Sequence, residues 1–279
     1  MDVTLTLQTR IVDTVEVVRQ TNPMAGSVTN SVTMNFVANA QLAVGGSAAM
    51  VYLADEAVAI AKAGGASYIN FGTFEPFYVD TLPQMAHELS VSNKPWVIDP
   101  VGIGIGGLRT QILTDFKAYK PSIIRGNASE VIALANLWGL DAGNNQSNVR
   151  GVDAQDAVDD ARAAAIAIAK WTNGAVAVSG ERDLITDGYY LAYSSGGSHF
   201  MNKITGAGCS LGGVMAVYAT SAPPFIAALT GAAIYNLAGQ RAEETAYGPA
   251  SFQEHFLDHL YRATAQEVAS QPFTLEVLA

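Results

Sequence analysis

The chain has 279 residues, of which 49% are hydrophobic and only 14% charged, and 25 acidic against 15 basic residues give it a net charge of −10. This composition supplies a sizeable core and a surface poor in charge, which suits a subunit that hides part of its outside in an oligomer. The acidic balance disfavours binding to nucleic acid, which needs basic patches.

Short apolar runs alternate with longer helical patterns along most of the chain. Glycine, proline or polar residues bound each run, which is typical of short buried strands. This alternation predicts βαβ units around a mostly parallel sheet, in a single domain over residues 1–279. The strands are expected at Ala48–Val51, Ser67–Phe71, Trp96–Asp99, Ser122–Arg125 and Ala175–Ser179, and the helices at Val32–Val44, Glu56–Ala63, Leu82–Ser90, Leu108–Phe116, Ala128–Trp138 and Asp153–Trp171.

The pattern changes after the last of these strands. Asp183–Asp187 and Tyr189–Tyr193 flank Gly188, and this turn residue predicts an antiparallel hairpin at the edge of the sheet. The segment Asp141–Gly151 has the composition of a flexible loop, but the alternation resumes beyond it, so we do not expect a domain boundary there. Three helices should end the chain, at Ala207–Ser221, Pro224–Ala246 and Ser251–Val268.

One long uncharged stretch, between Lys203 and Arg241, raises the question of a membrane span. Pro223-Pro224 divides it, and each half is shorter than the roughly 20 apolar residues that a span needs. We therefore expect two buried helices and no membrane segment. The N-terminus shows no signal-peptide pattern, and the single cysteine, Cys209, excludes an intramolecular disulfide, so a reducing, cytoplasmic location is expected.

The most informative motif is Ile-Thr-Gly-Ala-Gly-Cys at residues 204–209, which opens a helical stretch. Its glycines free backbone N–H groups at a helix start, those of Ala207 and Gly208 among them, and such groups form an anion site. The thiol of Cys209 would feel the positive helix end, which favours thiolate. A phosphate cradle and a reactive side chain in one turn suit phosphoryl transfer to an alcohol, although a simple turn into a helix explains the motif alone equally well.

Polar residues follow the predicted strands at their carboxyl ends, where parallel sheets bind ligands. Asp99 ends one strand and Glu130 lies in the first turn after another, so the two carboxylates could hold Mg²⁺, although each alone could simply cap a turn or helix. Arg125 could bind phosphate oxygens or pair with a neighbouring carboxylate. Ser179 could bind phosphate or ribose, or merely begin a turn. Beside the phosphate turn, the acids favour a metal site.

Two further patterns favour structural roles. Gly102, Gly104 and Gly107 fit Gly-x-Gly-x-x-Gly after a strand, but a proline separates them from the strand and no acid ends the next strand. A dinucleotide-dependent oxidoreductase is therefore a distant alternative. His255 and His259 are spaced i, i+4 like half a zinc site, but no further ligand accompanies them, so packing is expected.

Taken in order, the motifs resemble those of the hydroxyethylthiazole kinase family, a thiamine-pathway branch of the ribokinase-like enzymes. The resemblance covers nearly the whole chain and implies a three-layer α/β/α fold with a mostly parallel central sheet and an antiparallel edge hairpin. The segments that carry it are Val28–Asn30, Asn35–Asn39, Gly45–Met50, Asn70–Thr73, Asp99–Gly102, Arg125–Glu130, Thr205–Cys209 and Gly248–Phe252.

This resemblance implies an ATP- and Mg²⁺-dependent kinase that phosphorylates the primary alcohol of 4-methyl-5-(2-hydroxyethyl)thiazole. It also implies a homotrimer with the thiazole pocket at subunit interfaces, and no nucleic-acid or membrane partner is expected. In the implied roles, Met50, Gly206 and Asn30 contact the substrate, Arg125 and Ser179 contact the nucleotide, Asp99 and Glu130 associate with the metal, and Cys209 stands where related kinases carry an aspartate base.

The chain departs from the family pattern at four places, one of them Ser179, which stands where the family usually has threonine and keeps a hydroxyl. Where the family commonly has a histidine, Gly26 ends the segment Pro23–Gly26, and the segments Gly45–Met50 and Gly102–Gly107 also differ from the usual motifs. These departures concern the alcohol more than the chemistry. Two alternatives therefore stay open, namely a related kinase for another small alcohol such as hydroxymethylpyrimidine, and a thiazole-binding protein without catalysis.

Overall fold

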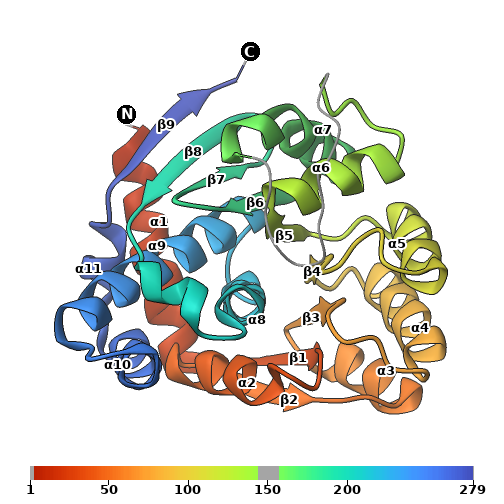
Figure 1. Ribbon diagram of the computed structural model, residues 1–279, viewed down its shortest axis with the longest axis horizontal. Coiled ribbons are helices and arrows are strands. Elements are labelled where there is room, and N and C mark those ends of the chain that lie inside the picture. Colours follow the sequence, from red (N-terminus) through yellow and green to blue (C-terminus); the bar gives the residue numbers. More distant parts are fainter. Residues whose placement is uncertain (1–2, 144–156, 279) are drawn as a thin grey trace.

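Six short strands lie side by side in parallel at the centre of the molecule, five of them where the alternating apolar runs predicted a strand. The structure is a computed structural model that describes residues 3–143 and 157–278 (Figure 1). Within these residues the sheet has the strand order β2-β1-β3-β4-β5-β6-β7-β8-β9, and β6 to β9 pair antiparallel. The strands are β1 (Met24–Val28), β2 (Ser47–Met50), β3 (Ala66–Asn70), β4 (Trp96–Asp99), β5 (Ile123–Asn127), β6 (Ala175–Ser179), β7 (Arg182–Thr186), β8 (Tyr190–Ser195) and β9 (Phe273–Val277).

Helices cover both faces of this sheet, so the three-layer α/β/α fold is confirmed (Figure 1). On one face lie α1 (Val3–Thr21), α2 (Met34–Ala43), α8 (Ala207–Ala219), α9 (Pro224–Thr245), α10 (Pro249–Arg262) and α11 (Ala265–Ala269). The other face carries α3 (Ala54–Ala63), α4 (Tyr78–Val91), α5 (Gly107–Tyr119), α6 (Ala128–Leu137) and α7 (Arg162–Thr172).

Successive residues of the central strands enter different cores, because side chains along a strand alternate between its two faces. Tyr68 and Val97 point toward the core beneath α8 and α9, whereas Ile69 and Ile98 join the core beneath α4 and α5. All four are fully buried. Burial on both faces explains why these strands read as nearly continuous apolar runs in the sequence.

Three elements were not expected from the sequence, namely α1, β1 and β9. The run Met-Ala-Gly-Ser-Val of β1 has one β-branched residue and a glycine in its middle, and both features weaken a strand pattern. Gly26 lies where a β-carbon would collide with the side chain of Ile60 on α3. Where the family commonly has a histidine, this chain therefore packs β1 closely against α3.

Two of the predicted helices are not single α-helices. Ser251–Val268 is divided into α10 and α11, because Thr264 accepts a hydrogen bond from the Glu267 N–H at 3.3 Å and begins a new helix through a capping box. The helix expected at Asp153–Trp171 begins with a 3₁₀ turn at Val158–Ala161 and continues as α7. Residues 153–156, and residues 144–151 of the expected loop, lie outside the described residues.

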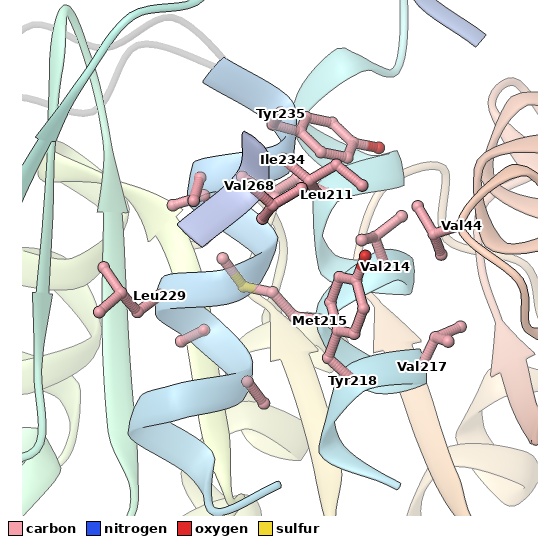
Figure 2. Close-up of a cluster of buried hydrophobic side chains, with 14 of the residues drawn as sticks. Val44, Leu211, Val214, Met215, Val217, Tyr218, Leu229, Ile234, Tyr235 and Val268 are labelled. Carbon is pink, nitrogen blue, oxygen red and sulfur yellow. The ribbon is translucent and has the colours of Figure 1, made fainter. Parts of the chain in front are cut away.

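The uncharged stretch forms the buried pair α8 and α9, as expected. No helix in the described part of the chain has the length and apolar character to cross a bilayer. Figure 2 shows Met215 of α8 lying between the two helices. A β-carbon on Gly231 of α9 would come within 2.7 Å of the Met215 side chain, so the missing side chain there permits close packing of the helices.

Met215→Ala is expected to destabilise the protein by about 2–5 kcal/mol, because it leaves a cavity in this interface. Met215 is fully buried, whereas Val91 at the end of α4 is 65% exposed. The matched control Val91→Ala should change the free energy of unfolding by less than about 0.5 kcal/mol. Urea unfolding of both variants measures the difference, and equal effects would contradict the packing described for α8 and α9.

Candidate active site

A pocket of about 1090 Å³ lies at the carboxyl ends of the parallel strands, beside the first turn of α8. Ligands bind at this edge of open parallel sheets because the connecting loops gather there. Most of the residues singled out from the sequence line it, namely Asn30, Arg125, Glu130, Ser179, Gly206, Ala207, Gly208 and Cys209. Asp99 is fully buried beneath the pocket, and Met50 is not among the lining residues.

The cysteine turn opens α8 as the motif predicted. Gly206 is the N-cap residue with φ +89°, and a β-carbon there would meet Thr33 at 2.9 Å, so both backbone and space call for glycine. The N–H groups of a first helical turn have no acceptor within the helix. Those of Ala207 and Gly208 belong to pocket-lining residues, so this turn can receive an anion.

Cys209 lies within reach of Asn30, whose Nδ2 is 3.8 Å from the thiol sulfur. Burial, with a further contribution from the negative charge of Asp99, raises the pKa of the thiol to about 11. The expectation of a thiolate was therefore wrong. The positive end of α8 is outweighed because the sulfur is desolvated and close to a buried carboxylate.

Arg125 and Asp99 form a buried ion pair, with Nη1 3.0 Å from Oδ2. The salt bridge weighed from the sequence is thus present, and it leaves part of the guanidinium available to the pocket. A β-carbon on Gly208 would lie 2.5 Å from Nη2, which places the guanidinium directly against the cysteine turn. Asp99 Oδ1 is buried without a hydrogen-bond partner. Burial raises the pKa of Asp99, and the guanidinium opposes that shift.

Glu130 caps the helix that carries it. Its Oε2 accepts a hydrogen bond from the Asn127 N–H at 2.8 Å, and the Asn127 side chain accepts one from the Glu130 N–H at 2.9 Å. The first-turn role weighed from the sequence is therefore present too. Burial, together with the nearby charge of Asp99, raises the pKa of the Glu130 carboxyl to about 7. This acid therefore changes charge in the neutral range.

A chain of hydrogen bonds joins Cys209 to Asp99, and the sequence did not reveal it. Asn30 donates to Asn70 Oδ1 at 2.7 Å, Asn70 donates to the Tyr68 hydroxyl at 2.9 Å, and that hydroxyl donates to Asp99 Oδ2 at 3.3 Å. Tyr68 looked like a core residue, since its ring is fully buried. Only the side-by-side position of Asn70 and Asp99 on β3 and β4 brings these groups together.

Ser179 ends β6 at the pocket, where Gly180 N–H donates to Asp183 Oδ1 at 3.1 Å. Asn236 of α9 donates to Asp183 Oδ2 at 3.1 Å. Burial raises the pKa of Asp183 to about 6. Asp183 and Asn236 were missed, because one falls in the predicted hairpin and the other in an apolar helix. Their contacts shape the turn that presents the Ser179 hydroxyl.

Neither dismissed motif supplies the site with ligands. Within residues 3–143 and 157–278, no group of three or more histidine, cysteine or acidic side chains is arranged to hold a metal ion. His255 Nδ1 lies 2.9 Å from the Thr245 hydroxyl, as expected for a packed helix. Gly102, Gly104 and Gly106 all have positive φ and form the open loop before α5.

This fold and site define a class. A mostly parallel sheet with helices on both faces, and a pocket at its carboxyl edge where α8 begins, is the architecture of the ribokinase-like fold. The fold is shared with the pyridoxal kinase of Staphylococcus aureus, solved in complex with AMP-PCP and pyridoxal, at a TM-score of 0.56 and 16% identity, over 78% of this chain and 88% of that one.

The comparison with known sequences is more specific. A family model described as the hydroxyethylthiazole kinase family matches residues 15–266, and the chain belongs to this family. The hydroxyethylthiazole kinase of Bifidobacterium longum subsp. infantis is 48% identical over 97% of this chain and 92% of its own length. That of Cereibacter sphaeroides is 39% identical over 88% and 91%. The structure of the Pyrococcus horikoshii hydroxyethylthiazole kinase protein has a TM-score of 0.84 and 25% identity, and covers 96% of this chain and 99% of that one. The resemblance stated from the motifs is confirmed, and the chain is a kinase.

Proposed function

We propose that this chain transfers the γ-phosphoryl group of ATP to the primary alcohol of hydroxyethylthiazole, with residues 1–279 acting as a single kinase domain. The observation that carries this proposal is the position of Arg125. Its guanidinium is 3.0 Å from Asp99 and lies against Gly208, so the buried acid, the cation and the first turn of α8 meet at the floor of one pocket. Membership of the kinase family supports the reaction that we propose. The closeness of Asp99, Arg125 and Gly208 supports this pocket as the place where the reaction occurs.

The transition state of phosphoryl transfer spreads negative charge over the equatorial oxygens, and positioned donors stabilise it. The N–H groups of Ala207 and Gly208 would hold the transferring group. Arg125 would add donors from the opposite side, because Asp99 engages only one end of its fork. Ser179 would contact the nucleotide at the end of β6. In each of these roles, a hydrogen-bond donor of the pocket would face the negative charge of the phosphate groups.

Asp99 and Glu130 would hold Mg²⁺, which binds through one or two carboxylates together with substrate phosphates. The residues fit the ion, because Asp99 Oδ1 is buried without a hydrogen-bond partner beneath the pocket and Glu130 lines that pocket. When bound, the ion would neutralise charge on the ATP phosphates. The capping bond to Asn127 fixes the Glu130 carboxyl group in place.

Activity should rise with pH through about 7, because Glu130 is protonated below that pKa and a protonated acid holds Mg²⁺ poorly. We expect kcat/KM for Mg·ATP to fall about tenfold for each pH unit below 6, since that ratio reports the free enzyme. Glu130→Gln should be slow and should lack this limb of the profile. A wild-type profile that stays flat between about pH 6 and about pH 8, one unit on either side of the pKa of Glu130, would contradict this assignment.

Cys209 would orient the alcohol as a thiol, because its pKa of about 11 keeps it protonated at neutral pH. Cys209→Ala should therefore lower kcat by only about tenfold or less, whereas loss of a general base costs roughly 100- to 10,000-fold. Steady-state kinetics at saturating ATP measure the difference. A loss above about 100-fold would return Cys209 to the role of base.

Asn30, Gly206 and Met50 would contact the thiazole, and a homotrimer would bring them together. Asn30 and Gly206 line the pocket, but Met50 ends β2 at the open edge of the sheet. The apolar residues Val32 and Leu42 are exposed by 63% and 54%, which suits a surface that another subunit covers. Light scattering of the purified protein should give a mass of three chains.

The proposal is tested with purified protein, Mg·ATP and hydroxyethylthiazole, by mass detection of the phosphate ester. Hydroxymethylpyrimidine competes in a second reaction, and preferential phosphorylation of that alcohol would identify the related kinase. Thiazole binding without ADP formation would identify a binding protein. Because a free thiol persists in reducing surroundings, we also propose a cytoplasmic location, which fractionation checks.

A further inference from the structure

Arg109, in the first turns of α5, ties two loops together through their backbone. Its Nε donates to the Phe71 carbonyl at 3.0 Å and its Nη2 to the Gly72 carbonyl at 2.7 Å. Its Nη1 donates to the carbonyl of Ile105 at 2.7 Å. One planar guanidinium thus joins the loop after β3 to the glycine loop after β4. A lysine cannot make this contact, because its donors lie on a single atom.

Hydrogen bonds connect the loop after β3 to Cys209 through Asn70 and Asn30. The Gly72 N–H donates to Asn70 Oδ1 at 2.9 Å, and Asn30 donates to the same oxygen at 2.7 Å. Gly72 also lies against Asn30, since a β-carbon on Gly72 would be 2.5 Å from Asn30 Nδ2. Asn30 in turn contacts the sulfur of Cys209. Holding Gly72 therefore holds the side chain beside the thiol.

The glycine loop after β4 lies beside Glu130. Gly102 packs against Arg109, because its β-carbon would be 3.5 Å from the guanidinium carbon. The Gly102 backbone lies near the Glu130 carboxylate, whose pKa it lowers, and both residues line the pocket. The loop has open space at two positions, since β-carbons on Gly104 and Gly106 would meet nothing within 4 Å. Arg109 therefore anchors this loop beside Glu130 together with the buried side chain of Ile103.

Arg109 has no ion-pair partner within the described residues, and its hydrogen bonds above go to neutral carbonyls. Its guanidinium also lies over the Phe74 ring, 5.2 Å from the centroid. A cation used only for charge would not need three carbonyls arranged around its plane. Arg109 thus holds the loop after β3 and the glycine loop after β4 together, and we call this set of three hydrogen bonds the clamp.

We propose that Arg109 is a positioning residue that fixes the cysteine half of the site relative to the acid half. This inference rests on the proposed function for its kinetic test, but not for its structural one. In the proposed function, the alcohol would lie beside Asn30 and Cys209, and the metal that binds the ATP phosphates would lie beside Glu130. The clamp therefore sets the distance between the attacking oxygen and phosphorus.

The kinetic test compares Arg109→Lys with Arg19→Lys. Arg19 also donates to backbone carbonyls of another segment, 3.1 Å to Tyr261, but lies outside the pocket. Arg109→Lys should lower kcat roughly 10- to 100-fold, because small misplacements of reacting groups are costly, and change both KM values by less than about threefold. Arg19→Lys should keep wild-type kcat. Methylguanidine should partly restore turnover to Arg109→Ala.

The structural test uses the thiol of Cys209, the only cysteine in the sequence. In Arg109→Lys, release of Gly72 and Asn30 should speed the reaction of this thiol with an aromatic disulfide several-fold, whereas Arg19→Lys should react like wild type. This readout needs no turnover. A wild-type chain that makes no phosphate ester would refute the proposed function while the thiol rates still decide the clamp.

Three results would overturn the clamp. Unchanged thiol reactivity in folded Arg109→Lys is the first, even if kcat falls, because Arg109 would then act through another route. Wild-type kcat in that variant is the second. A rise of more than about tenfold in KM for ATP with kcat intact is the third, since it would make Arg109 a direct phosphate ligand. Melting temperatures of all variants establish that each one is folded.

Discussion

Asp99→Asn should lower kcat by roughly 1000-fold, the largest loss that we expect from any single isosteric change in this chain. The substitution keeps the shape of the side chain and removes its charge. Arg125 then keeps a buried positive charge without its partner at 3.0 Å, and the unpartnered Oδ1 no longer offers a carboxylate oxygen to Mg²⁺. Stability should fall as well, by about 3 kcal/mol, because breaking a buried pair strands the remaining charge.

A second substitution separates these two effects. In Asp99→Asn/Arg125→Met the stranded cation is gone, so the double variant should regain most of the lost stability in urea unfolding. It should regain no turnover, because both the acid and the phosphate donor are missing. Recovery of turnover would show that the loss in Asp99→Asn came from misfolding. Near-normal kcat in Asp99→Asn itself would remove this acid from the reaction.

The acids and Arg125 could be predicted from the sequence because parallel strands end at one edge of the sheet. Asp99 follows the apolar run of β4, and Arg125 lies in β5, so their meeting requires only that these strands be neighbours, as they are. Glu130 follows Asn127 at the spacing of a capping box, which the structure contains. In each case a local pattern and one general rule of topology were sufficient.

Tyr68 could not be assigned in this way. Its position in an apolar strand predicts a core residue, and its ring is one. What matters is that its hydroxyl reaches Asp99, and this depends on the register between β3 and β4 and on Gly212 of α8. A β-carbon on Gly212 would lie 2.5 Å from the tyrosine ring, so only glycine lets the helix approach so closely. Such fits arise between segments far apart in the chain.

The protonation state of the Cys209 thiol also could not be predicted from the sequence. The helix start is visible in the sequence, and its partial positive charge favours thiolate. Burial and the distance to Asp99 are not visible, and they raise the pKa of the thiol. Two opposing electrostatic effects decide this group, and the sequence supplies the sign of only one of them.

Gly208→Ala should lower kcat/KM for ATP at least about 100-fold with little loss of stability. A methyl group there would meet Arg125 Nη2 at 2.5 Å and Nη1 at 2.6 Å, and the pair with Asp99 prevents the guanidinium from moving aside cheaply. Alanine favours a helix over glycine by up to about 1 kcal/mol, which offsets part of the strain. The control Gly248→Ala places its methyl in open space and should leave kcat/KM unchanged, at a cost of at most about 1 kcal/mol of stability because Gly248 is the N-cap residue of α10.

The cause of this loss can be read from a double-mutant cycle with Arg125→Ala. If the methyl acts by displacing the guanidinium, Gly208→Ala should cost almost nothing further once that guanidinium is gone. If the methyl instead shields the N–H groups of the turn, the two losses should add. Strong non-additivity in kcat/KM would therefore establish that residue 208 must be glycine because a side chain there would displace the Arg125 guanidinium. Additive losses would mean that the turn binds phosphate without help from that side chain.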